Sequence, residues 1–156
     1  MPSIINMSKT VLFICTGNYY RSRYAEIYFN HLAPKMGLDW KAFSRGLEAS
    51  AGRNEGPISR FALKRLVHRE LSPGDPPRFP IQLEEQDLQE AGLIVAINRV
   101  EHQPMMHEYF PSWVGKIMYW DVADLNITDA ENALPVLEER IHSLLEDLRS
   151  NSQNQS

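Results

Sequence analysis

Short apolar runs alternate with helical patterns along most of the chain. The clearest strand candidates are the continuous apolar runs at residues 11–14 and 93–97, and weaker strand patterns cover residues 40–47 and 116–120. A continuous run, rather than an alternating one, is expected where both faces of a sheet are covered. The pattern therefore predicts a sheet with helices on both sides.

Apolar residues at steps of three and four between these strands predict helices. One helix is expected from residue 22 to about 32, a second over residues 58–66 and a short acidic one at about 84–91. Residues 101–109 fit a helix or a turn. The segment 71–80 holds four prolines and is expected to be a loop.

The most regular apolar stripe lies near the C-terminus and predicts the final helix. Its members are Leu134, Leu137, Ile141, Leu144, Leu145 and Leu148. Pro135 is expected in the first turn of this helix, where a missing N–H group is tolerated. Because strands and helices alternate, we predict one α/β domain over residues 9–149 with a parallel sheet. Residues 1–8 and the polar residues 150–156 are expected to be flexible tails.

Composition excludes several classes of protein. The 156 residues fit one domain, and a net charge of -4 provides no basic face for a nucleic-acid backbone. No segment approaches the roughly 20 apolar residues of a membrane helix, and the N-terminus lacks a secretory-signal pattern, so we expect a cytoplasmic protein. The single cysteine excludes an internal disulfide, and the five histidines lack metal-ligand spacing, so no metal is expected.

The one cysteine directly follows the first predicted strand. It opens the run Cys15-Thr16-Gly17-Asn18-Tyr19-Tyr20-Arg21-Ser22, which leads into the first predicted helix. Ligands of parallel α/β sheets bind at the carboxyl ends of strands, and this loop occupies such an end. The position favours a functional loop over a buried structural cysteine.

The residue types of this loop suit a tetrahedral oxyanion. Backbone N–H groups of residues 16–21 can surround the anion at the positive end of the following helix, and Gly17 gives the backbone room. Arg21 can hold two oxygens of a phosphoryl group with its planar guanidinium. The same positive field favours the thiolate of Cys15, which would face phosphorus as a nucleophile.

Four more residues of the run extend this interpretation. Ser22 can donate a hydrogen bond to the cysteine sulfur, and Asn18 can hold the backbone of the loop. Tyr19 and Tyr20 are expected to contribute backbone amides to the phosphate cradle.

The run resembles the signature of the low-molecular-weight protein tyrosine phosphatases, Cys-x-Gly-Asn-x-Cys-Arg-Ser-Pro, which also follows a first strand near the N-terminus. The chain matches it at Cys15, Gly17, Asn18, Arg21 and Ser22. The resemblance spans nearly the whole chain and implies a three-layer, flavodoxin-like fold with a four-stranded parallel sheet flanked by helices. It also implies a phosphatase that forms a cysteinyl-phosphate, needs no cofactor, and acts on a phosphorylated protein or a small phosphomonoester.

The resemblance further implies a general acid after the fourth strand, where the family has Asp-Pro. Asp124 aligns best with this acid, with Leu125 in place of the proline, and Asp121 is the competing candidate. A positioned acid typically contributes about 10²–10⁴-fold by protonating the leaving oxygen. Ser44 and Asn98 align with family positions that support the site.

Departures from the family pattern affect substrate choice. Arg23 replaces the proline of the signature and is expected to be a solvated helix residue. Tyr20 replaces its second cysteine. The aromatic residues that follow the acid in tyrosine-specific members are absent, so Tyr19 or Tyr20 is the alternative wall for a substrate ring. Phosphotyrosine preference is therefore open.

Two other functions remain open. A degenerate family member would bind phosphorylated partners without turnover, and the substitution at Leu125 motivates this alternative. Thioredoxin-coupled arsenate reductases share the loop and fold, but their disulfide cascade needs additional cysteines, so arsenate reduction here would require an external thiol. The oligomeric state is not specified by the sequence.

Overall fold

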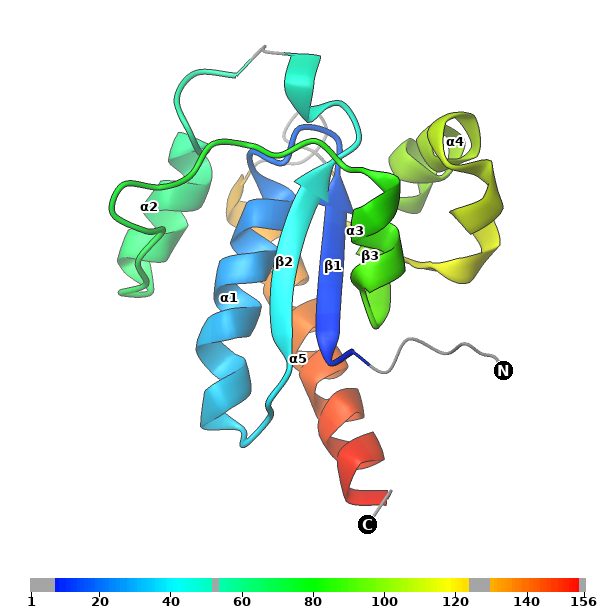
Figure 1. Cartoon of the computed structure of the whole chain (residues 1–156). Coiled ribbons are helices and arrows are strands. Elements are labelled where there is room, and N and C mark those ends of the chain that lie inside the picture. The colour runs from blue at the N-terminus through cyan, green and yellow to red at the C-terminus, as the bar shows by residue number, and fades with distance from the viewer. Residues whose placement is uncertain (1–7, 52–53, 124–129, 155–156) are drawn as a thin grey trace.

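A four-stranded parallel sheet forms the centre of the protein (Figure 1). The computed structural model describes residues 8–51, 54–123 and 130–154. Along the sheet the strand order is β2-β1-β3-β4, with these bounds: β1 Thr10–Cys15, β2 Lys41–Gly46, β3 Leu93–Ala96 and β4 Met118–Tyr119. All three strand pairs are parallel, which confirms the predicted fold class.

Helices cover both faces of this sheet. The helices of one face are α1 (Arg21–Lys35), α2 (Arg60–His68) and α5 (Ala130–Asn154). The other face carries α3 (Glu85–Glu90), α4 (Arg99–Tyr109) and the 3-10 helix η2 (Pro111–Lys116), while a short 3-10 helix, η1 (Ala49–Ala51), follows β2. No described helix is long and apolar enough to cross a membrane.

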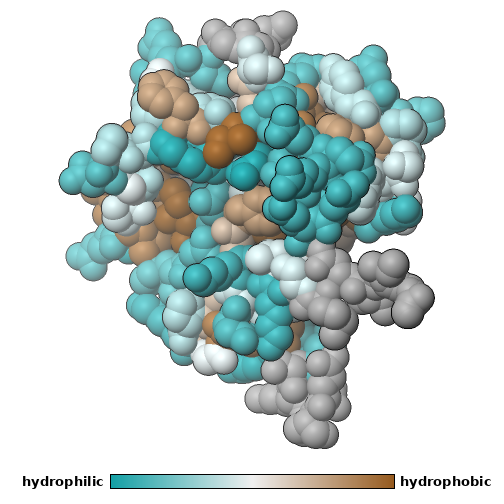
Figure 2. All heavy atoms as spheres, viewed as in Figure 1, coloured by the Kyte–Doolittle hydropathy of each residue, from teal (hydrophilic) through white to brown (hydrophobic). Residues whose placement is uncertain are grey.

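The central strand β1 supplies residues to both cores, which explains its continuous apolar run. Val11 and Phe13 pack with the helices α1, α2 and α5, whereas Leu12 and Ile14 pack against α3 and α4. Successive side chains of a strand point to opposite faces, so a doubly covered strand needs apolar residues throughout. The face of the molecule seen in Figure 2 is mostly hydrophilic, with apolar residues in small separate patches.

The bounds of α2 and α5 differ from the sequence prediction in ways that have a local cause or consequence. Helix α2 begins at Arg60 because the Ser59 hydroxyl caps it, accepting a hydrogen bond from Phe61 N at 3.1 Å. Helix α5 already includes Ala130, so Pro135 lies inside the helix and not in its first turn. The same helix continues to Asn154 and includes residues 150–154, which were expected to belong to a tail.

Candidate active site

The cysteine loop connects the carboxyl end of β1 to the N-terminus of α1. Cys15 is the last residue of β1 and is buried, with 3% of its surface exposed. Its Sγ lies 2.9 Å from the Oγ of Ser22, in the first turn of α1. The Ser22 oxygen also accepts a hydrogen bond from Asn18 Nδ2 at 2.9 Å, which leaves the hydroxyl hydrogen for the sulfur. A donated hydrogen bond of this kind stabilises a thiolate.

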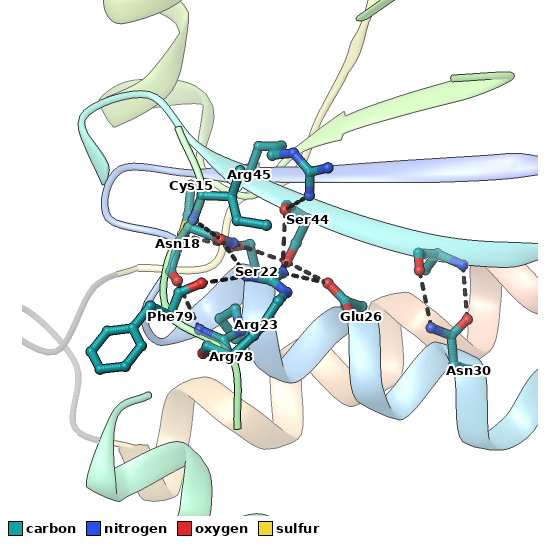
Figure 3. Close-up of polar contacts among 12 residues, drawn as sticks. Cys15, Asn18, Ser22, Arg23, Glu26, Asn30, Ser44, Arg45, Arg78 and Phe79 are labelled. Carbon is teal, nitrogen blue, oxygen red and sulfur yellow. Dashed lines mark hydrogen bonds and ion pairs between the residues drawn. The ribbon is translucent and has the colours of Figure 1, made fainter. Parts of the chain in front are cut away.

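Asn18 holds the loop in shape (Figure 3). Its φ is 51°, in the left-handed region that Asn tolerates better than most residues. The side-chain Nδ2 donates to Ser22 and to Ser44 Oγ, both at 2.9 Å. The side-chain Oδ1 accepts from Ile81 N at 2.9 Å and from Arg78 Nη1 at 3.1 Å. One buried amide therefore ties the loop to β2 and to residues 78–81.

Ser44 and Arg78 continue this network to helix α1. The Ser44 hydroxyl donates to Glu26 Oε1 at 2.7 Å, and Arg78 Nη2 donates to the same oxygen at 2.9 Å. Ser44 thus lies where the family resemblance put a supporting serine. Arg78 was missed by the sequence analysis, since it lies in the proline-rich segment that was assigned only as loop.

Arg23 is not the solvated helix residue that the sequence suggested. Only 1% of its surface is exposed, and its Nη1 donates to the carbonyl oxygen of Pro57 at 2.7 Å. Its Nη2 donates to the carbonyl oxygen of Arg78 at 2.6 Å, and Figure 3 shows Arg23 beside Arg78. Burial and the nearby charge of Arg78 lower the pKa of Arg23 to about 10, so it remains charged at neutral pH. Because α1 begins at Arg21, position 23 faces the two loops beside the helix N-terminus and not solvent.

Gly46 allows β2 to approach the loop closely. The parallel register puts Cys15 beside Gly46, the last residue of β2. A Cβ added to Gly46 would lie 2.8 Å from Thr16 O and 2.8 Å from Asn18 N, both main-chain atoms of the loop. Glycine is therefore required here by the space available.

We expect Gly46→Ala to destabilise the protein, because the added methyl group must displace main-chain atoms. Overpacking of this kind lowers the free energy of unfolding by about 1–3 kcal/mol, which urea denaturation would measure. Gly115→Ala is the matched control, since a Cβ at Gly115 meets no atom within 4 Å among the described residues. Equal stability of the two variants would contradict the proposed close approach.

Arg21, the first residue of α1, is buried, with only 2% of its surface exposed. Its Nη1 donates to the carbonyl oxygen of Val122 at 2.9 Å, just beyond β4. Its Nη2 lies 2.9 and 3.1 Å from the two carboxylate oxygens of Glu101, in the first turn of α4. Arg21 therefore joins the cysteine loop to the segments that follow β3 and β4, and Glu101 is a partner that the sequence analysis missed.

The two tyrosines of the loop have different environments. Tyr20 is the N-cap residue of α1 and is buried in the core, so it is not an exposed wall for a substrate ring. Tyr19 is half-buried, and its hydroxyl donates to the carbonyl oxygen of Glu55. No side chain caps the α1 N-terminus within the described part of the chain. Its first amides are thus suited to an anion.

Of the two candidates for the general acid, the structure describes only Asp121. Asp124 lies outside the described residues. Asp121 is exposed, and its carboxylate pairs with Arg140 of α5 at 2.9 Å. Asn98, aligned with a family aspartate, caps α4 by accepting a hydrogen bond from Glu101 N at 2.9 Å.

A buried thiol, a helix N-terminus and a buried arginine come together at the carboxyl end of a central parallel strand, an arrangement typical of enzymes that transfer phosphoryl groups through cysteine. The sequence matches the family model for low molecular weight phosphotyrosine protein phosphatases over residues 10–154, and the chain belongs to this family. A search among curated proteins gave no match.

Solved structures of phosphatases share the fold over almost their whole length. The low molecular weight protein tyrosine phosphatase from T. tengcongensis is 27% identical, with a TM-score of 0.68 and coverage of 91% of this chain and 98% of that chain. The tyrosine phosphatase AmsI from Erwinia amylovora is 22% identical, with a TM-score of 0.73 and coverage of 94% and 95%. A YwlE mutant from Bacillus subtilis is 24% identical, with a TM-score of 0.76 and coverage of 90% and 98%.

Proposed function

We propose that this protein hydrolyses phosphomonoesters through a cysteinyl-phosphate intermediate, with phosphotyrosine in proteins as the substrate class. The observation that carries the proposal is the 2.9 Å contact between Cys15 Sγ and Ser22 Oγ, in a loop with the buried guanidinium of Arg21 beside it. Family membership supports the same chemistry. The half-buried ring of Tyr19 on the loop supports an aromatic substrate.

The reaction proceeds in two balanced steps. In the first, the Cys15 thiolate attacks phosphorus, the bond from phosphorus to the leaving oxygen breaks, and Asp124 gives that oxygen a proton. The loop amides and Arg21 stabilise the charge on the equatorial oxygens. In the second, Asp124 takes a proton from water, the water oxygen attacks phosphorus, and the sulfur leaves again as thiolate. The products are the alcohol or phenol and inorganic phosphate.

Hydrolysis of p-nitrophenyl phosphate in the presence of EDTA tests the proposal. We expect turnover that inorganic phosphate inhibits competitively, because product and substrate share the loop. A folded protein that binds phosphate without turnover from mildly acidic to neutral pH would instead be a non-catalytic phosphate-binding member of the family. Peptides carrying phosphotyrosine and phosphoarginine would then compare substrate classes, since one structural neighbour is described as the YwlE arginine phosphatase.

The general acid is tested by removing its proton. Asp124→Asn is expected to lower turnover by about 10²–10⁴-fold, because the leaving oxygen would depart unprotonated. Phosphate affinity should change little. Asp121→Asn is the matched control, since Asp121 is exposed and paired with Arg140. A large loss for Asp121→Asn with an unchanged rate for Asp124→Asn would reverse the assignment.

A further inference from the structure

The carboxylate of Glu101, from helix α4, contacts Arg21 of the cysteine loop. Arg21 and Glu101 are 80 residues apart in sequence, and Glu101 Oε2 lies 2.9 Å from Arg21 Nη2. We propose that Glu101 is a positioning residue that fixes the Arg21 guanidinium in the orientation required to grip the transferring phosphoryl group. The inference rests on the phosphatase function proposed above and assigns a role to a residue outside the loop signature.

Three side chains donate hydrogen bonds to this carboxylate. Arg21 Nη2 is one donor and the Thr16 hydroxyl is a second. The third is His102, whose Nε2 lies 3.1 Å from Glu101 Oε2 and 3.2 Å from the Thr16 oxygen. Burial opposes ionisation of Glu101, but the hydrogen bonds from His102, Arg21 and Thr16 outweigh it and hold the pKa of its carboxyl well below its usual range. Glu101 is therefore an anion throughout the pH range of an ordinary assay.

The buried ring of His102 fixes the direction of one of these bonds. Its Nδ1 accepts a hydrogen bond from the backbone N–H of Asn98 at 3.0 Å. In a neutral imidazole the proton must then be on Nε2, which faces Glu101. The Asn98 side chain in turn accepts from the Glu101 N–H at 2.9 Å. The start of α4 thus holds the carboxylate in one place before a substrate binds.

The guanidinium is also held at its other end. Arg21 Nη1 donates to the Val122 carbonyl at 2.9 Å, and Val122 N in turn donates to Ile97 O at 3.0 Å. Two fixed acceptors on different elements define the plane of a guanidinium much better than one does. A buried arginine without its carboxylate would also lose its compensating charge, so its side chain would be drawn towards water.

Glu101 brings two opposing effects to the bound phosphate. Its negative charge repels the anion, while its contact with Arg21 aligns the groups that stabilise the transition state. Replacing the carboxylate with an amide removes this repulsion but loosens the alignment of Arg21. For phosphate binding in the ground state the two effects partly cancel. For the chemical step, which depends on the alignment, the loss is not offset. Displacement of a binding group by about 1 Å lowers rates by about 100-fold.

Kinetics of Glu101→Gln, Glu101→Asp and Glu108→Gln test the role of Glu101. We expect Glu101→Gln to lower kcat for p-nitrophenyl phosphate by about 100-fold, with a much smaller change in the dissociation constant of inorganic phosphate measured by calorimetry. Glu101→Asp keeps the charge and should restore part of the loss. Glu108 is an exposed carboxylate on the same helix, so Glu108→Gln should match the wild type.

A double-mutant comparison shows whether Glu101 acts through Arg21. In an Arg21→Lys background, Glu101→Gln should add no more than about a twofold loss, because the guanidinium it aligns is absent. An additional loss as large as in the wild type would overturn the proposal and leave a general structural role. A rise in kcat for Glu101→Gln would also overturn it, since the carboxylate would then be a competitor of phosphate.

The Nε–H resonance of Arg21 in a proton–nitrogen NMR spectrum tests the alignment without turnover. Arg21→Lys assigns the resonance by its loss. We expect a sharp, slowly exchanging resonance in the wild type and in Glu108→Gln, and a broadened one in Glu101→Gln. An unchanged resonance in Glu101→Gln would overturn the positioning role. If the wild type had no phosphatase activity, the proposed function would be refuted. The role of Glu101 in holding Arg21 would still be tested, because the NMR comparison does not require turnover.

Discussion

Cys15→Ser is expected to abolish hydrolysis of p-nitrophenyl phosphate, with a loss on the order of 10⁵-fold or more, the scale seen when a covalent nucleophile is removed. The serine oxygen stays protonated at neutral pH, so the nucleophile is lost while the shape of the loop is kept. The Ser22 hydroxyl lies 2.9 Å from the sulfur and would face the new hydroxyl at the same place. Initial rates with and without EDTA measure the effect.

Phosphate binding is the control for this substitution. Calorimetry with inorganic phosphate should give a dissociation constant close to that of the wild type, because the amides and Arg21 remain. Residual activity above about a hundredth of the wild-type rate would contradict a cysteinyl-phosphate and point to direct attack by water.

Arg21→Lys is expected to give the second largest loss, about 10²–10³-fold in kcat, the usual effect of removing one preorganised donor from a transition state. A lysine ammonium is a single point of charge and cannot grip two phosphoryl oxygens in a plane. It also cannot contact the Val122 carbonyl and the Glu101 carboxylate together, as the guanidinium does. Steady-state kinetics with p-nitrophenyl phosphate measure the loss.

Arg149→Lys is the matched control, since Arg149 is a half-buried residue near the end of α5 whose only ion pair among the described residues is with Glu146. Its kinetics should equal those of the wild type. A loss in Arg21→Lys confined to KM, with kcat unchanged, would show that Arg21 binds substrate and transition state equally and would contradict its role in the chemical step.

Local patterns predicted most of the fold and one central contact of the candidate site. The apolar run before Cys15 predicted a strand covered on both faces, and the loop residues predicted the contact between Ser22 and the sulfur of Cys15, because each signal lies within a few neighbouring positions. Strand β4 was predicted over residues 116–120 but pairs only at Met118 and Tyr119. It is an edge strand, and the 3-10 helix η2, which ends at Lys116, includes the first residue of the predicted strand.

Two supporting residues, Arg78 and Glu101, could not be predicted because their partners are far apart in sequence. Arg78 is 60 residues from Asn18, and Glu101 is 80 residues from Arg21. Neither follows a motif, and each is a charged side chain of an ordinary type on a helix or loop. Their roles depend on the strand order, which brings the ends of β1, β2 and β3 together. Arg23 was misassigned for the same reason, since its burial depends on two distant loops.

The hydrogen bonds of Arg23 limit which nearby positions can vary in sequence among related enzymes. Its two shortest hydrogen bonds are with main-chain carbonyls, those of Pro57 and Arg78, and every amino acid supplies a carbonyl. The side chain at position 57 can therefore change during evolution without loosening the start of α1, whereas the side chain of Arg78 also bonds Asn18 and Glu26 and must be kept. Substrate preference can therefore change through the loop around Pro57 while the neighbouring site keeps its shape, as long as Arg23 and Arg78 are retained.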